Sequence, residues 1–103
     1  MKTIYKYVIS NTPELVSGEN LDAKLTLPVG SKILCCKIQN KEDICVWVEL
    51  DTEVEEKEQI FITMYGTGWD MCQLNGLNYE YLDTIMIGNG VFVYHVYVIK
   101  GIN

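Results

Sequence analysis

The chain has 103 residues, of which 49% are hydrophobic and 21% are charged, so we expect one globular domain over residues 1–103. The net charge is −6 and every cationic side chain is a lysine, which argues against duplex nucleic acid as a partner because neutralising phosphates needs a basic face. The apolar runs are short and the start, MKTIYKY, lacks an apolar signal region, so we expect no membrane association and a cytoplasmic location.

The first predicted strand covers residues 3–10, TIYKYVIS. Alternate side chains of a strand point to opposite faces, so Tyr5 and Tyr7 share one face while Lys2 and Lys6 share the other. Flat aromatic surfaces beside lysines are what a groove for a small nucleotide would need. The same residues would serve equally as anchors of a protein interface.

Two further strands and two turns follow. Residues 21–27, LDAKLTL, alternate between apolar and polar side chains, which is the pattern of a half-buried strand. The PVG at 28–30 predicts a turn, and residues 31–39 are rich in strand-forming residues. The polar NKED at 40–43 then predicts a hairpin loop.

The middle of the chain continues the strand pattern. Residues 44–50, ICVWVEL, place four aliphatic side chains on one face and Trp47 on the other, so we expect Trp47 to be partly exposed unless a second layer covers it. The segment DTEVEEKE at 51–58 carries five carboxylates against one lysine and is interpreted as a solvated hairpin tip. A strand that is apolar on both faces is expected at 58–65.

The last predicted strand, residues 91–100, is also apolar on both faces. Neither face can be left in water over its whole length. This strand is therefore expected either to be central in the fold or to meet a partner subunit with one face. On that basis we expect a homo-oligomer.

Glycine and proline mark the element boundaries, and no segment shows a helical period, although residues 72–78 could hold a brief helical turn. Short strands joined by hairpins predict an all-β fold, namely a single-domain antiparallel β-sandwich or partly closed barrel of about seven strands. The expected strands are 3–10, 21–27, 31–39, 44–50, 58–65, 78–87 and 91–100.

The cysteines and the single histidine do not predict catalysis. Cys35, Cys36, Cys45 and Cys72 follow no metal-binding spacing, and the adjacent pair would point to opposite faces of a strand, so we expect reduced thiols and no metal. His95 stands among apolar neighbours and is more typical of a hydrogen-bonded core or interface residue than of a catalyst. Without a nucleophile signature or clustered ligands, we expect no enzyme and no cofactor.

The segment Tyr65-Gly66-Thr67-Gly68-Trp69 interrupts the strands and is the main candidate site. It lacks the second half of a dinucleotide-binding fingerprint, and no helix pattern follows it to bind phosphate. Two glycines would let backbone N–H groups turn toward an anion, Thr67 adds a hydroxyl, and the flanking rings could stack on a base. The alternative, which the residue types alone favour, is a strand-ending turn whose aromatics cap the end of the barrel.

The whole chain resembles a family of small β-rich proteins encoded by bacteriophages. The likeness is carried, in this order, by MKTIYKYVI at the start, LPVGSKIL (27–34), QNKEDICVWVELD (39–51), YGTG (65–68), YLDT (81–84) and VFVYHV (91–96). Residues 11–20, the loop 69–78 and the tail after Val96 look particular to this chain.

That family is similar to phage immune-evasion proteins, the anti-CBASS sponges, which bind cyclic dinucleotides or related signals without cleaving them. The resemblance implies a sponge for a small nucleotide signal in the cytoplasm of an infected bacterium. The alternative function is a phage accessory protein that binds a host protein. From residue chemistry, the expected ligand-binding residues are Trp47, Tyr65 and Trp69 for stacking, the Gly66–Gly68 backbone and Thr67 for phosphate, Lys2 or Lys6 for charge, and His95.

Overall fold

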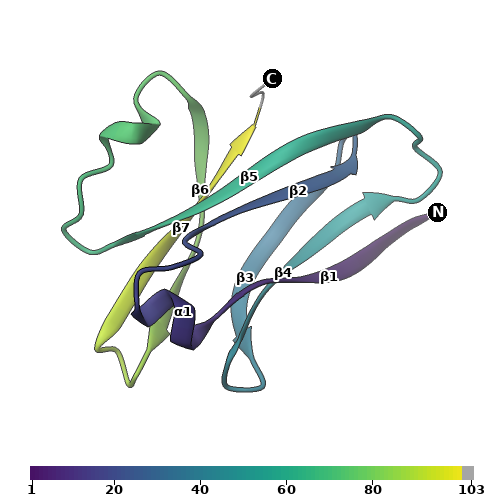
Figure 1. The fold of residues 1–103 in the computed structure, drawn as a ribbon. Coiled ribbons are helices and arrows are strands. Elements are labelled where there is room, and N and C mark those ends of the chain that lie inside the picture. Colours follow the sequence, from purple (N-terminus) through teal and green to yellow (C-terminus); the bar gives the residue numbers. More distant parts are fainter. Residues whose placement is uncertain (101–103) are drawn as a thin grey trace.

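The computed structural model describes residues 1–100, which form seven strands in two antiparallel sheets (Figure 1). The prediction of an all-β, antiparallel, seven-stranded fold is confirmed, in the form of an open sandwich and not of a closed barrel. In chain order the elements are β1 (Lys2–Asn11), α1 (Thr12–Val16), β2 (Asp22–Pro28), β3 (Lys32–Gln39), β4 (Asp43–Asp51), β5 (Lys57–Gly66), the 3₁₀ turn η1 (Cys72–Leu74), β6 (Asn78–Ile87) and β7 (Phe92–Lys100).

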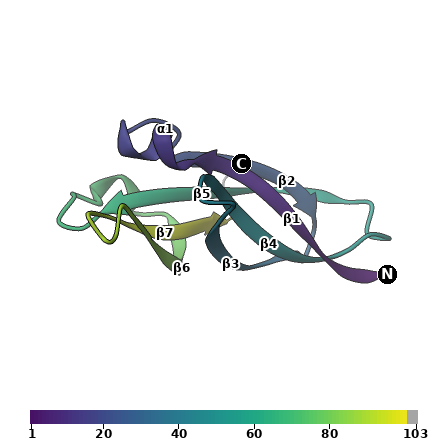
Figure 2. The same ribbon diagram turned by 90° about the horizontal axis from the view of Figure 1, so that it is seen from below.

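The two sheets differ in size. The three-stranded sheet has the order β1-β4-β3, and the four-stranded sheet has the order β2-β5-β7-β6. Figure 2 shows how flat the molecule is, and its principal extents are 42 × 35 × 18 Å. That thickness suits two layers of strands about 10 Å apart, with one core between their inner faces.

The alternation in β4 shows how this core is built. Val46 and Val48 are completely buried between the sheets, whereas Trp47 points to the outer face and is half-buried, as the sequence pattern predicted. Ile62 of β5 and Val96 of β7 fill the same core from the four-stranded sheet. Each such aliphatic side chain contributes about 1.5–3 kcal/mol on burial, so a slip of one residue in register would be strongly unfavourable.

β7 is central in the four-stranded sheet, which was one of the two alternatives for this strand. It pairs with β5 on one side and with β6 on the other. On its inner face Tyr94 and Val96 enter the core, and on its outer face Ile99 packs with Tyr65 and Leu74 in a second, smaller cluster. The fold itself therefore covers much of both apolar faces, and homo-oligomerisation stays a prediction.

The interpretation of residues 51–58 as a hairpin tip is wrong. β4 ends at Asp51 in the three-stranded sheet, and β5 begins at Lys57 in the four-stranded sheet, so the acidic segment crosses between sheets. The physical reason is that β4 already has β1 and β3 on its two edges and has no edge left for β5. Glu53, Glu55 and Glu56 are nevertheless exposed, as expected of a solvated segment.

The helix α1 was not expected from the sequence. Its start carries ordinary signals, since the Asn11 side chain accepts a hydrogen bond from the Glu14 backbone N–H at 2.9 Å and Pro13 stands in the first turn. A helix of five residues is too short to show a helical period. The brief turn expected within 72–78 is present as η1, and no helix of residues 1–100 is long and apolar enough to cross a membrane.

An acidic residue joins the two sheets where β3 and β6 approach each other. Asp83 accepts the backbone N–H of Cys36 at 3.1 Å and forms an ion pair with Lys37 at 3.0 Å. The pairing register of β3 shifts between Ile33 and Cys35, and that of β6 shifts between Tyr81 and Asp83. Such bulges re-aim side chains at sheet edges, which here lets a β6 carboxylate reach the β3 backbone.

Candidate functional site

A tight turn ends β5 at the segment singled out in the sequence. The Trp69 backbone N–H donates to the Gly66 carbonyl oxygen at 3.1 Å and closes a β-turn. Gly68 has a φ of +86°, a conformation that glycine adopts without strain. The segment is therefore a strand-ending turn, and the same turn also borders a hollow.

Gly66 is required for a different reason from Gly68. Its φ is not positive, but the indole of Trp69 folds back directly onto it. A Cβ at this position would lie 2.6 Å from Cε2 and 2.7 Å from Nε1 of Trp69, which is closer than real contacts allow. Glycine at position 66 therefore leaves the space in which the indole lies.

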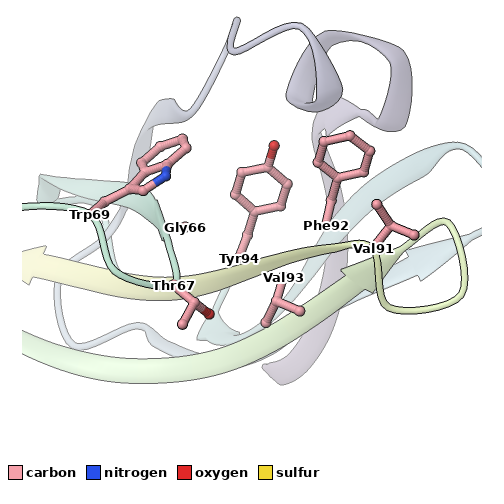
Figure 3. Close-up of a pocket in the computed structure, with 7 residues that line it drawn as sticks. All are labelled: Gly66, Thr67, Trp69, Val91, Phe92, Val93 and Tyr94. Atoms are coloured by element: carbon pink, nitrogen blue, oxygen red, sulfur yellow. The ribbon is translucent and has the colours of Figure 1, made fainter.

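Three aromatic rings stand in a row on one side of β7. Figure 3 shows Trp69, Tyr94 and Phe92 pointing to the same side, with Thr67 and Val93 on the other. The rings of Trp69 and Tyr94 meet edge to face, with centroids 6.0 Å apart and planes at 85°. The Tyr94 hydroxyl donates to the Leu15 carbonyl oxygen at 2.6 Å, which fixes the middle ring against α1.

A hollow of about 200 Å³ lies beside this row, and we call it the turn hollow (Figure 3). The last pair between β5 and β7 is Gly66 with Tyr94, so Phe92 and Val93 pair only with β6. The hollow thus stands where β5 would continue, beside a stretch of β7 that has no strand partner on this side. Its lining consists of Gly66, Thr67, Trp69, Val91, Phe92, Val93 and Tyr94.

His95 is held on the outer face of β7 by a short hydrogen-bond network. Its Nε2 is 2.8 Å from the Thr67 hydroxyl, and its Nδ1 is 3.2 Å from the Thr84 hydroxyl. The Thr84 hydroxyl in turn lies 2.6 Å from the Tyr81 hydroxyl. Both ring nitrogens have a partner, so the histidine ties the turn to β6.

A group of tyrosines on the same outer face was not expected. Tyr97 meets Tyr65, Tyr79 and Tyr81 edge to face, with centroids 6.3, 5.7 and 5.8 Å away. Tyr79 and Tyr81 are exposed. Their spacing of two in the strand 78–87 was a signal that both would lie on one face.

The predicted ligand-binding residues fall into two separate groups. Thr67 and His95 are in contact with each other. Tyr65 is only 7% exposed and packs with Leu74, so little of its ring is free for stacking. Trp47 lies on the outer face of the three-stranded sheet beside Lys6, its partner in the β1–β4 register.

The two lysines are engaged away from the turn. The Lys6 ammonium donates to the Gln39 side chain at 2.7 Å, and Lys2 pairs with Asp51 in the β1–β4 register. Both lysines belong to β1 in the three-stranded sheet, whereas the turn ends β5 in the four-stranded sheet, so the structure does not bring the lysines to the turn.

The turn hollow has no positive side chain in its lining. Over residues 1–100, no group of three or more histidine, cysteine and acidic residues is placed to hold a metal ion. The four cysteines are free. Burial, and next the charge of Asp83, raises the pKa of the Cys36 thiol to about 12, while Cys72 is exposed. The turn hollow therefore offers a ligand aromatic ring surface, exposed backbone groups and uncharged hydroxyl groups.

Comparison with curated proteins and with solved structures finds no significant match. A comparison with protein-family models finds one match, over residues 1–101. That match covers nearly the whole chain, and the protein therefore belongs to the family described as a domain of unknown function, DUF7352.

Proposed function

We propose that the protein binds a small nucleotide signal through its base, in the turn hollow, and sequesters it without cleaving it in the cytoplasm of an infected bacterium. The observation that carries the proposal is the exposed indole of Trp69 beside the stretch of β7 that has no strand partner on the β5 side. Trp69 is 48% exposed even though its ring is anchored on Gly66. A fixed and accessible aromatic plane is what stacking on a base needs.

The size of the hollow indicates which part of the ligand enters it. Sites for small organic ligands usually measure about 300–1,000 Å³. The turn hollow, at about 200 Å³, suits one heterocyclic ring system rather than a whole nucleotide. The backbone groups of the Phe92–Val93 stretch that do not point to β6 would then meet the edge of the base, which is where its donors and acceptors lie.

The phosphates are expected to remain largely in solvent. The lining contains no lysine, the Thr67 hydroxyl already contacts His95, and the Gly66 carbonyl already accepts the Trp69 N–H. This changes the roles expected from the sequence, in which the glycine backbone and Thr67 contacted phosphate. Binding should therefore depend little on the number of phosphates and little on salt.

The environment of His95 supports binding without turnover. Cleaving a phosphodiester needs a positioned base, an activated nucleophile or a metal. Both nitrogens of His95 contact threonine hydroxyls. Within residues 1–100, no carboxylate or ammonium is hydrogen-bonded to the hydroxyl of Thr67 or Thr84. We therefore propose that the ligand leaves the protein chemically intact.

The test is a thermal-shift and calorimetry screen of nucleosides, nucleoside monophosphates and cyclic dinucleotides. Trp69→Leu should weaken binding by at least about fivefold, because stacking on an aromatic side chain contributes about 1–3 kcal/mol per base. The matched control is Trp47→Leu, which removes the other tryptophan from the opposite sheet and should leave binding unchanged. A screen without any shift, or equal losses in both variants, would contradict the proposal.

A second candidate function is binding of a host protein through the outer face of β6 and the β6–β7 loop. It is favoured by three large side chains in water, since Tyr81 is 58%, Met86 61% and Val91 75% exposed. Tyrosine and methionine are enriched at protein interfaces. Capture of one defined host protein by the wild type but not by Tyr81→Ser, together with a negative nucleotide screen, would favour this function.

A further inference from the structure

Two larger hollows lie on the outer face of the four-stranded sheet, between β2 and the segment 67–77. Their volumes are about 380 and 340 Å³. They share Asp22, Thr63, Tyr65 and Gln73 in their linings, so they form one continuous depression, which we call the β2 groove. Each falls within the range of about 300–1,000 Å³ that is usual for small organic ligands.

The wall of the β2 groove is mostly apolar. Phe61 of β5 and Ile99 of β7 are paired in register, and Leu74 of η1 packs over this part of the sheet with Tyr65. Leu77 completes the wall and is partly exposed. A ligand that reaches these side chains must therefore have an apolar body, because contact with them displaces water from both surfaces.

The charges of the β2 groove have one sign. Asp22 and Asp70 are in its lining, and no lysine is. One oxygen of Asp22 accepts the Thr63 hydroxyl, and one oxygen of Asp70 accepts the Cys72 backbone N–H at 2.8 Å. Each carboxylate has a second oxygen and further lone pairs with which to accept.

No cation of the described chain neutralises these carboxylates. Among residues 1–100, the ion pairs within 4.0 Å involve Asp51, Glu53 and Asp83, and Lys24 on β2 is absent from the lining of the β2 groove. The pKa of Tyr65, which lines the same groove, is affected by these negative charges. Desolvation raises the pKa of Tyr65, a hydrogen bond with Thr63 opposes the rise, and the charges of Asp22 and Asp70 add to it.

We propose that the β2 groove binds a small organic cation, an amine on an aromatic or branched apolar body, with its ammonium group at Asp22. The apolar wall takes the body of the ligand, and the unneutralised carboxylates at the β2 side take the charge. An anion would meet two carboxylates and no cation, and an alcohol of the same shape would lose the ion pair. The β2 groove and the turn hollow have Trp69 in common, and no other residue lines both. The ammonium site at Asp22 is absent from the lining of the turn hollow, so the proposal does not depend on a nucleotide binding there.

The probe is 2-phenylethylamine, compared with 2-phenylethanol and 3-phenylpropionate, which have similar bodies and different charges. Titration of ¹⁵N-labelled protein should give saturable shifts at the amides of Thr63, Gln73 and Leu74. The amine should bind more tightly than the alcohol, and the carboxylate should bind most weakly. The preference for the amine should shrink at high salt, because screening weakens a partly exposed ion pair.

Asp22→Asn keeps an oxygen for the Thr63 hydroxyl and removes the charge. It should weaken binding of the amine by up to about fivefold, as for a partly exposed ion pair, and leave the alcohol unaffected. Asp43→Asn makes the same change of net charge on β4, in the other sheet, and is the matched control. If Asp22→Asn does not fold, Asp70→Asn removes the other carboxylate charge of the β2 groove, and it should weaken binding of the amine more than Asp43→Asn does.

Three results would overturn the proposal. The first is equal affinity for the amine and the alcohol. The second is an amine affinity that Asp22→Asn lowers no more than Asp43→Asn does. The third is the absence of saturable shifts at the groove amides up to the solubility limit of the amine.

Discussion

The carboxylate of Asp83 on β6 accepts the backbone N–H of Cys36 on β3 at 3.1 Å, although the two strands belong to different sheets. Asp83 also accepts the backbone N–H of Thr84 at 2.9 Å, and its side chain pairs with Lys37. One acidic residue therefore satisfies backbone donors on both edges and joins the sheets on this side of the sandwich.

Replacing Asp83 with alanine should destabilise the fold. Its loss leaves the Cys36 N–H without its acceptor in a partly buried place, a penalty of about 1–3 kcal/mol. Urea unfolding measures the effect. Lys37→Gln removes only an exposed ammonium and should destabilise much less. Equal losses in the two variants would show that the ion pair, and not the backbone contact, joins the sheets.

The same carboxylate should make stability depend on pH in the acid range. Desolvation raises the pKa of Asp83, but hydrogen bonds from Cys36, Lys37 and Thr84 outweigh it and hold the pKa below the usual 3.8. Because the pKa of Asp83 is lower in the folded protein than in the unfolded chain, its ionised carboxylate stabilises the fold at pH values above the unfolded pKa of about 3.9. This stabilisation is lost as the pH falls through the folded pKa.

Unfolding free energies of wild type and Asp83→Asn should therefore differ by a constant amount from neutral pH down to about pH 5, and converge below about pH 4. The measurement is a urea titration at each pH. A difference that is the same at every pH would mean that Asp83 has an ordinary pKa in the folded protein.

The strands were predictable because each carries its own local signal. In 44–50, Val46 and Val48 alternate with Trp47, and the structure buries the two valines and leaves the tryptophan half-exposed. The order of the strands was not predictable in this way. β5 joins the other sheet because β4 is already paired with β1 and β3 on its two edges. This condition depends on strands far apart in the sequence, and the residues of the acidic segment 51–58 do not indicate it.

The same difference between local signals and non-local pairing applies to the candidate site. The turn was recognisable from Gly66 and Gly68, and the contact between Thr67 and His95 joins two residues that both stood among the candidates. Grouping Trp47 with the turn failed because nothing local says which sheet a strand joins. The β2 groove was missed because its members come from β2, β5, β7 and the loop, and none of them is conspicuous alone.

The thiols should differ sharply in reactivity. Burial raises the pKa of Cys36 to about 12, and burial also raises that of Cys45, so neither forms a thiolate readily near neutral pH. Cys72 is exposed. In native protein Ellman's reagent should modify Cys72 first, and Cys36 and Cys45 should react only after unfolding. Rapid reaction of all the thiols in native protein would contradict the buried placement.

Gly66→Ala should displace the indole of Trp69, because the added Cβ would lie 2.6 Å from the ring. We expect a loss of about 1–3 kcal/mol, the usual cost of overpacking, with a red shift of tryptophan emission. Trp47 also emits, so the shift is read in a Trp47→Phe background.

In a Trp69→Leu background the clash with the indole ring is gone, and Gly66→Ala should cost much less stability. A double-mutant cycle measures this coupling between positions 66 and 69. Gly68→Ala is the control, since its cost comes from a φ of +86° and should stay the same in both backgrounds. Equal costs of Gly66→Ala with and without the indole would refute the view that glycine stands at 66 to seat Trp69.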